Sequence, residues 1–351
     1  MIRVAILGAG IGAQHLAAYR ELQTVFKVAL VVDQDVVRAR NLQNVDDEFT
    51  VSPDIKDALG ANDIDLIDIC LPPHLHAGTT ISALKAGKDV ICEKPLATSL
   101  KDAHAIQSCV SETGKSVFPV FQYRWGTPLA QLKHLIDAGI AGQPQIASLE
   151  THWSRDAEYY AVPWRGTWAG EQGGAVLGHA IHSHDLLQLF MGPVASVGAH
   201  LTTRINDIET EDCAAVTFEM QNGALATSNI TLGAAGNETR LRFVFENLTA
   251  TSGLSPYSPG SESWSLKARV PNTQSTIDAE LRQCPAQHVG FRGFLKSVAQ
   301  DIIHASGCSV SVNDGVASIE LVSAIYAATR SGKRVTLPLG RDHMLYKGWQ
   351  P

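Results

Sequence analysis

The chain has 351 residues, which is enough for two domains because a single hydrophobic core stops growing at about 250–300 residues. Hydrophobic residues make up 45% and charged residues 18%, and the formal net charge is −7, a balance typical of globular proteins. No run of five or more like charges occurs, and no apolar run reaches the roughly 18 residues that a membrane-spanning helix needs, so we expect neither a nucleic-acid partner nor a membrane partner.

The cysteines and the N-terminus bear on the cellular compartment. Six cysteines lie far apart without a CxxC pair, and the first residues lack the pattern of a secretory signal peptide. We therefore expect reduced thiols and a cytoplasmic protein.

The first 121 residues alternate apolar runs with helical stretches near 13–24, 74–86 and 99–113. The runs are "RVAILGAG", "KVALVVD", "IDLIDICLPP", "DVICEKP" and "SVFPVFQ". Continuous Val, Ile and Leu between helices indicate a parallel sheet covered on both faces. We predict a doubly wound Rossmann domain over residues 1–121.

Residues 122–351 have a different hydrophobic pattern, with longer alternating segments, which predicts an α+β domain with a large, mostly antiparallel sheet. Helices are expected near 128–138, 176–191, 288–305 and 314–331. The segment "QPQIASLETHW" follows the first of these helices. The longer alternating strands are "VASVGAHLTTR", "DCAAVTFEM", "GALATSNITL" and "ETRLRFVFE", and the Asn-Gly pair at 222–223 predicts a tight hairpin. Such a one-faced sheet often packs on a partner subunit, so we expect a homodimer or homotetramer formed through it.

The glycine-rich segment "GAGIGAQH" follows the first strand and opens a helix. Its glycines let the backbone approach a pyrophosphate, and the helix N-terminus offers unpaired N–H groups. The spacing is GxGxG, with Ala13 where a third glycine of the usual fingerprint could stand. We take the cofactor contacts here to be Gly8, Gly10, Ile11 and Gly12.

Asp33 ends the second strand, about 20 residues after the glycines. A carboxylate there accepts hydrogen bonds from ribose hydroxyls and repels a 2′-phosphate, so NAD is favoured. Arg38 and Arg40 are expected to lie too far into the next helix to reverse this, although they keep NADP as an alternative.

The segment "GGAVLGHAIHSHDLL" at 173–187 combines histidines with an aspartate. On a helix His184 lies opposite His182, whereas His179, His182 and Asp185 share a broad face. That face could hold a metal ion, but no HExxH or comparable ligand set accompanies it, so we expect none.

Several motifs together resemble the Gfo/Idh/MocA family of sugar and inositol dehydrogenases. They are "RVAILGAGIGAQH", "CLPPHLH", "HAGTTISALKAGKDVICEKPLATS", "FQYRW" and "GGAVLGHAIHSHD", and the likeness extends to "AIYAATRSGKRVTLPL". The resemblance implies that Lys94 of "EKP" hydrogen-bonds the reacting hydroxyl beside the nicotinamide, with a following proline peptide that is often cis. It also implies cofactor contacts from Leu71, Pro72, His76 and Glu93, while Pro73 stands where the family more often has Asn.

The family pattern GGxxxDxGxHxxD aligns His182 and Asp185 with its last two polar positions, which implies that His182 is a general acid/base. Where the pattern has its first aspartate, this chain has Gly178, and Ala180 replaces the next glycine. Asp185 could instead orient His182, or His179 could enter the cleft.

Aromatic and cationic side chains crowd the segments "FQYRW" and "HWSRDAEYYAVPWRGTW", a combination that suits a polyhydroxylated ring, although packing between domains is the alternative for each residue. The predicted substrate contacts are Tyr123, Arg124, Trp153, Arg155, Tyr160, Trp164, Arg165, His179 and Asp185.

The sequence thus predicts an NAD-dependent dehydrogenase that oxidises a secondary hydroxyl of a sugar, anhydrosugar, glycoside or inositol, with Lys94 and His182 as catalytic residues. Two alternatives stay open: an NAD-using glycosidase of the same family, and a dinucleotide-binding sensor without turnover. The net negative charge gives no reason to expect a phosphorylated substrate.

Overall fold

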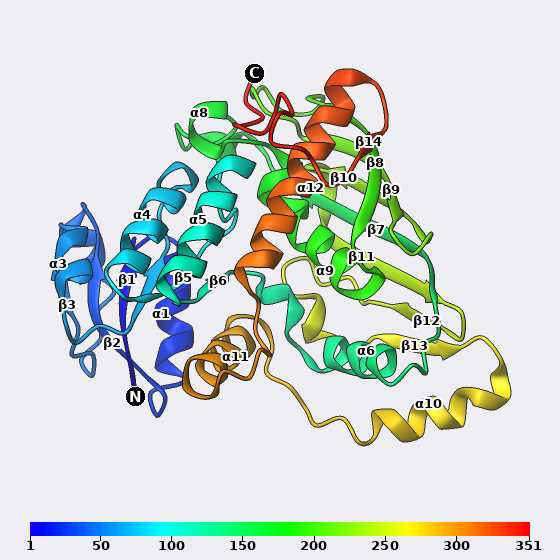
Figure 1. Ribbon diagram of the computed structural model, residues 1–351, viewed down its shortest axis with the longest axis horizontal. Helices are drawn as coiled ribbons and strands as arrows, with labels where there is room; N and C mark the ends of the chain where they lie inside the picture. The colour runs from blue at the N-terminus through cyan, green and yellow to red at the C-terminus, as the bar shows by residue number, and fades with distance from the viewer. The chain divides into compact units, whose positions relative to one another are not determined.

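The computed structural model describes residues 1–351, which form two compact units (Figure 1). The first unit comprises Met1–Phe121 and Phe294–Ile319, and the second comprises Gln122–Gly293 and Glu320–Pro351. The segment 294–319, placed with the C-terminal domain on sequence grounds, therefore packs with the first unit. Helices α11 (Gly290–His304) and α12 (Val312–Ser331) each contribute residues to both units.

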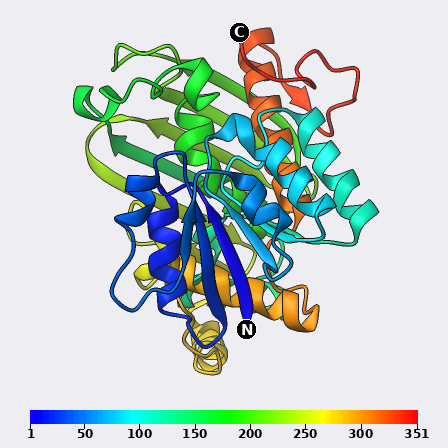
Figure 2. The same cartoon turned by 90° about the vertical axis from the view of Figure 1, so that its left-hand side faces the viewer.

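The first unit contains a six-stranded parallel sheet in the order β3-β2-β1-β4-β5-β6, which confirms the predicted doubly wound Rossmann fold. Figure 2 shows its first strands in blue with α1 beside them. The strands are β1 (Ile2–Leu7), β2 (Phe26–Val32), β3 (Thr50–Ser52), β4 (Leu66–Ile69), β5 (Asp89–Cys92) and β6 (Val117–Pro119).

Capping residues define where helix α5 of this unit begins and ends. Ser99 caps α5 by accepting the N–H of Asp102, and Gly114 ends that helix in the left-handed conformation. Figure 1 shows α4 and α5 side by side against the sheet. The helices before residue 121 are α1 (Gly12–Arg20), α2 (Val36–Arg40), α3 (Ile55–Gly60), α4 (Pro73–Lys85) and α5 (Leu100–Thr113).

The second unit contains an eight-stranded sheet in the order β13-β12-β11-β7-β10-β9-β8-β14. All pairs are antiparallel except β7 with β10, so the predicted mostly antiparallel sheet is confirmed. The strands are β7 (Pro144–Ser154), β8 (Val194–Thr202), β9 (Cys213–Met220), β10 (Leu225–Thr231), β11 (Gly233–Phe245), β12 (Leu248–Thr251), β13 (Ser265–Ala268) and β14 (Val335–Thr336).

The predicted Asn-Gly hairpin joins β9 to β10, where Met220 and Ala224 close the turn through a 2.8 Å backbone hydrogen bond. Gly223 takes a φ of +87°, which explains the glycine.

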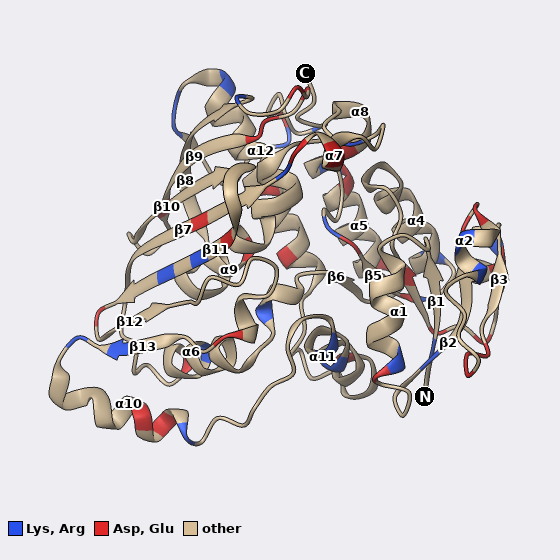
Figure 3. Ribbon diagram, turned by 180° about the vertical axis from the view of Figure 1, so that it is seen from behind, with Lys and Arg blue, Asp and Glu red and all other residues tan.

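Burial alternates along these strands, so the sheet has one covered and one open face. On the covered face α9 (Ile181–Met191) packs against β7 and β11. The open face carries mixed charge: Figure 3 shows basic segments on β11, where Arg240 lies 3.6 Å from Glu150 of β7.

The remaining helices of the second unit are α6 (Thr127–Asp137), α7 (Ala157–Tyr160), α8 (Trp168–Glu171) and α10 (Gln274–Leu281). Some elements were not predicted from the sequence, because each is too short to show a clear hydrophobic period. They are the helices α7, α8 and α10 and the strands β3, β12, β13 and β14. None of the helices combines the length and the apolar character that crossing a bilayer requires.

Candidate active site

The glycine-rich turn between β1 and α1 has a backbone that a ligand can approach closely. Gly8 has a φ of +103°, and a Cβ there would lie 2.4 Å from the carbonyl oxygen of Cys70. A Cβ on Gly10 would meet nothing within 4 Å, so the backbone at that point is bare. No side chain caps the N-terminus of α1, which leaves its first N–H groups to a ligand. Gly10, Ile11 and this helix end fit the pyrophosphate of a dinucleotide.

Asp33 lies just after β2 and is 6% exposed. Its carboxylate accepts the N–H groups of Ala9 at 2.7 Å and Asp35 at 2.8 Å, and it pairs with Arg38 at 2.7 Å. Burial alone would raise the pKa of Asp33, but these donors hold it below its usual value. Arg38 was expected to lie too far into the next helix to reverse the NAD preference. Its expected position was wrong, because α2 begins at Val36 and turns Arg38 back onto Asp33, whereas the NAD preference itself is unchanged.

The loop after β4 is tied to the loop after β5 through His76. Its ring nitrogens lie 2.7 Å from the carbonyl oxygens of Leu71 and Pro95. Burial lowers the pKa of this histidine. Pro72 precedes α4 and is exposed. His76 is only 1% exposed, so it supports the two loops from inside the protein.

Lys94 follows β5 at the carboxyl edge of the parallel sheet, the edge at which ligands bind in open α/β folds. The Lys94–Pro95 peptide is cis, as the family resemblance implies. The preceding Glu93 is 7% exposed and accepts the Lys94 N–H at 3.0 Å.

Behind Glu93 lies a buried ionic network that the sequence analysis missed. His15 contacts Asp68 at 2.9 Å through Nδ1 and Glu93 at 3.0 Å through Nε2, and Tyr19 donates to Asp68 at 3.0 Å. Both His15 and Asp68 are 0% exposed. Burial would lower the pKa of His15, but attraction to Asp68 raises it well above its ordinary value, so the ring is a cation between two acids. Asp68 inside the apolar run "IDLIDIC" was the available signal, since a charge there requires a partner.

His15, Asp68 and Cys70 also form a potential three-ligand metal cluster. Both ring nitrogens of His15 already contact carboxylates, and burial raises the pKa of the Cys70 thiol to about 12. A neutral thiol and an engaged imidazole make a poor metal site.

In the second unit the histidine segment begins as a π-helix at Val176–Ala180 and continues as α9. Glu211 anchors its start by accepting the N–H groups of Gly174 and Val176 at 3.1 Å and the Tyr326 hydroxyl at 3.0 Å. Burial raises the pKa of Glu211 to about 7. A Cβ on Gly174 would lie 2.0 Å from the Glu211 carbonyl oxygen, which explains this glycine.

The histidines of this segment face different neighbours. His182 stacks on Tyr123 with ring centroids 4.4 Å apart, whereas His184 lies 3.0 Å from the Ser228 hydroxyl on the sheet side. The predicted opposition of these two histidines is confirmed. Burial lowers the pKa of His184 to about 4. His179 packs edge-on against Trp153 at 5.2 Å.

Asp185 meets Arg124 in a two-point ion pair, with distances of 2.7 and 2.6 Å from Nε and Nη2 to the two carboxylate oxygens. Asp185 is 2% exposed. The carboxylate that could have oriented His182 therefore has a partner that the sequence analysis did not consider.

Around Trp153 the structure gathers much of the predicted substrate set into one cluster. The Trp153 ring packs against Tyr257 at 4.7 Å, and its indole donates to Thr239 at 3.1 Å. Tyr257 comes from the stretch 252–265, which is rich in Ser, Pro and Gly, and it was missed because no periodicity marks it. We name this group the Trp153 cluster: Trp153, Arg155, Tyr159, Tyr160, Trp164, Arg165, His179 and Tyr257.

The predicted site residues thus fall into two sets, one in each unit. The cofactor set and Lys94 lie in the first unit, and His182 with the predicted substrate contacts lies in the second. Within the second set Trp164 is 50% exposed, while Tyr123 is 4% exposed and donates its hydroxyl to the Pro256 carbonyl at 3.0 Å.

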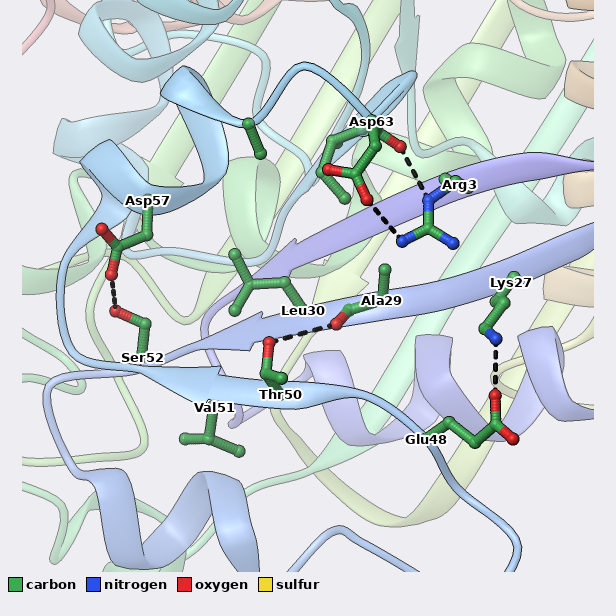
Figure 4. A pocket seen from close by; sticks show the side chains of 12 residues that line it. Arg3, Lys27, Ala29, Leu30, Glu48, Thr50, Val51, Ser52, Asp57 and Asp63 are labelled. Carbon is green, nitrogen blue, oxygen red and sulfur yellow. Dashed lines mark hydrogen bonds and ion pairs between the residues drawn. The ribbon is translucent and has the colours of Figure 1, made fainter.

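A pocket of about 440 Å³ lies elsewhere in the first unit, over β2 and β3 (Figure 4). Four of its charged side chains are paired with one another, Arg3 with Asp63 at 2.6 Å and Lys27 with Glu48 at 2.5 Å, and Asp57 accepts the Ser52 hydroxyl. It lacks the uncompensated polar groups that a specific ligand site needs, and it does not include the glycine turn or Lys94.

Two domain models of one family match this chain. The NAD-binding Rossmann-fold model of the oxidoreductase family matches residues 2–121, and the GFO/IDH/MocA C-terminal domain matches residues 129–251. The chain therefore belongs to the Gfo/Idh/MocA family of NAD-binding oxidoreductases.

Similar proteins agree with this assignment. Inositol 2-dehydrogenase of Rhodococcus erythropolis is 34% identical over 147 residues, which are 41% of this chain and 42% of that enzyme. The chain thus aligns with less than half of that relative. Inositol 2-dehydrogenase 3 of Saccharopolyspora erythraea is 26% identical over 359 residues, 99% of this chain and 98% of the relative. The WlbA dehydrogenase of Bordetella pertussis, solved with NADH and UDP-GlcNAcA, superposes with a TM-score of 0.84 at 26% identity, covering 97% of this chain and 99% of that one.

Proposed function

We propose that this protein oxidises a secondary hydroxyl of a sugar, sugar derivative or inositol and reduces NAD. The observation that carries the proposal is Lys94 at the carboxyl edge of the NAD-binding sheet, with its backbone N–H held by Glu93 at 3.0 Å. Two relatives named inositol 2-dehydrogenase, and a neighbour solved with NADH and a sugar nucleotide, support this substrate class.

The turn at Gly10 and Ile11, together with Asp33, would hold NAD, and its nicotinamide would supply the hydride acceptor. In this proposal Lys94 hydrogen-bonds the reacting oxygen and favours its alkoxide character, while His182 takes up the hydroxyl proton. His182 is held for this role by the ring of Tyr123 and by the rigid start of its helix at Glu211. Asp33 selects NAD by accepting ribose hydroxyls.

NADH formation by the purified protein over a panel of inositols, aldoses, sugar acids, anhydrosugars and glycosides tests the proposal. We expect one class to raise nicotinamide absorbance, and Lys94→Ala to lower the rate by roughly 10²–10⁴-fold. The exposed Lys101 of α5, changed to Ala, is the matched control and should leave the rate unchanged.

Two other outcomes would redirect the assignment. Aglycone release from a glycoside without net NADH would favour the NAD-using glycosidase. Dinucleotide binding without turnover of any class, unchanged in Lys94→Ala, would favour the sensor.

We further propose that the open face of the eight-stranded sheet binds a second copy of the chain. Exposed positions there alternate with buried ones, and a groove of about 360 Å³ runs over small residues of β8, β9 and β10. Outside this groove the same open face carries the paired residues Leu225 of β10 and Ile146 of β7, which are 50% and 46% exposed. Light scattering should give a dimer or tetramer mass, and Leu225→Glu should reduce it to the monomer; a monomeric wild type would contradict this.

A further inference from the structure

We propose that Arg155 and Arg165 bind an anionic group of the substrate, so that the substrate is an acidic sugar derivative: a sugar acid or a sugar phosphate. The inference rests on the proposed dehydrogenase function and narrows its substrate class. It departs from the sequence-based view that the net negative charge gives no reason to expect a phosphorylated substrate.

Arg155 is held in place by aromatic rings without an ionic partner. Its guanidinium carbon lies 5.1 Å from the Trp153 ring centroid and 4.9 Å from that of Tyr159. Its Nη1 donates to the Ser154 carbonyl at 2.7 Å and to the Asn237 side chain at 3.1 Å. Its Nε is buried and makes no hydrogen bond. A planar guanidinium fixed in this way is pre-organised, with donors left over.

Arg165 shares the same aromatic ring. Its guanidinium carbon lies 3.9 Å from the Tyr159 ring centroid and 5.4 Å from that of Trp164. Its Nη1 has one long contact, 3.5 Å to the Tyr159 carbonyl, and its Nε is also buried without a hydrogen bond. Two guanidinium groups therefore sit against Tyr159.

Three acidic side chains of this region, Asp156, Glu171 and Asp212, have other partners. Asp156 accepts the backbone N–H of Tyr159, Glu171 accepts that of Gly166 at 2.7 Å, and Asp212 accepts those of residues 204–206. Neither arginine has a carboxylate within ion-pair distance.

Arg124 offers a comparison in the same unit, because its guanidinium already has a carboxylate partner. It is paired at two points with Asp185 and needs no further anion. The two cations at Tyr159, by contrast, repel one another until an anion joins them. A carboxylate or phosphate matches the guanidinium fork, and the exposed ring of Trp164 offers an apolar surface for a sugar face.

The test compares matched ligands that differ only in charge. Glucose, glucuronate and glucose 6-phosphate form one set, and myo-inositol with its monophosphate forms another. Binding to the protein with NADH present is measured by calorimetry, and NADH formation with NAD is measured separately. The variants are Arg155→Met and Arg165→Met, with the exposed Arg282→Met as the matched control.

We expect an acidic member to bind at least tenfold more tightly than its neutral counterpart, with an affinity that falls as salt rises. Each arginine variant should weaken the acidic ligand by roughly ten- to hundredfold, while Arg282→Met leaves it unchanged. Preference for glucuronate or for the phosphate identifies which anion the substrate carries.

Equal binding of neutral and acidic members, absence of binding by every acidic member, or arginine variants that weaken both kinds equally would overturn the inference. The last result would mark the arginines as purely structural. Tight, arginine-dependent binding of an acidic member without NADH formation would keep this inference and reject the dehydrogenase function. NADH formation from neutral members alone would support the dehydrogenase function and reject this inference.

Discussion

Two clusters of charged side chains, one in each unit, treat charge in opposite ways. In the first, His15 lies between Asp68 and Glu93, so that every buried charge of the network has a partner inside the protein. In the second, Arg155 and Arg165 stand against Tyr159 without a carboxylate. The first arrangement fixes a backbone next to Lys94, whereas the second leaves donors available. The first arrangement fits a positioning role, and under the proposal above the second fits recognition of an anion.

The largest effect is expected from breaking the compensated network. His15→Gln leaves two buried carboxylates without a cation and should lower the free energy of unfolding by about 3–5 kcal/mol. Because the pKa of His15 is raised in the folded protein, its stabilisation is full below about pH 6.5 and is lost as pH rises through the higher folded value.

Urea unfolding measures this change, with the exposed His74→Gln as the control. Adding Asp68→Asn to His15→Gln should recover part of the loss, since one uncompensated carboxylate is removed. Additive losses would show that the network does not act as a unit.

A second prediction concerns Glu211, the buried acid of the second unit. Its folded pKa of about 7 lies above the ordinary 4.5, so its ionisation opposes folding and stability falls as pH rises from about 4.5 to about 7. The expected loss is on the order of 3 kcal/mol. Glu211→Gln should flatten this dependence between pH 5 and pH 8 in thermal unfolding, while the exposed Glu158→Gln should not; an unchanged profile would show that Glu211 is not the titrating group.

A third prediction uses the pair of Asp33 and Arg38 in the cofactor region. Asp33→Ala removes the ribose acceptor and releases Arg38, which can then meet a 2′-phosphate. We expect kcat/KM for NAD to fall roughly tenfold and the NADP to NAD ratio to rise by at least that factor. Steady-state kinetics with both cofactors measures it, and a ratio that stays constant would remove Asp33 from cofactor selection.

The smallest effect is expected at Gly178, where a Cβ would meet nothing within 4 Å. Gly178→Ala should leave stability unchanged or raise it by up to about 1 kcal/mol, because glycine weakens a helix. Gly174→Ala, four residues earlier, should instead be strongly destabilising, since its Cβ would lie 2.0 Å from the Glu211 carbonyl oxygen. Equal losses in the two variants would show that space at 178 is filled.

Periodicity and turn chemistry predicted the parts of the fold that short-range rules control. Continuous apolar runs identified β1, β2, β4, β5 and β6, and the Asn-Gly pair identified the β9–β10 turn. The parallel pairing of β7 with β10 could not be read in this way, because it joins strands about 80 residues apart and depends on the whole sheet.

The site residues likewise divide into those that local patterns predict and those that depend on tertiary contacts. A 100° step per residue was enough to separate His182 from His184, and the family motif singled out Lys94. The contact of His15 with Asp68 spans 53 residues, and the turn that brings Arg38 onto Asp33 depends on where α2 begins. Such tertiary contacts leave only indirect traces in a single sequence, such as an acid within an apolar strand.

The central claim is hydride transfer from a sugar-type hydroxyl carbon to NAD, and isotope transfer tests it most directly. The responsive substrate is labelled with deuterium at the carbon that bears the reacting hydroxyl, and the recovered NADH is examined by NMR. The account predicts deuterium at C4 of the nicotinamide, with transfer lost in Lys94→Ala and retained in Lys101→Ala. Product that forms while the nicotinamide stays unlabelled would contradict it.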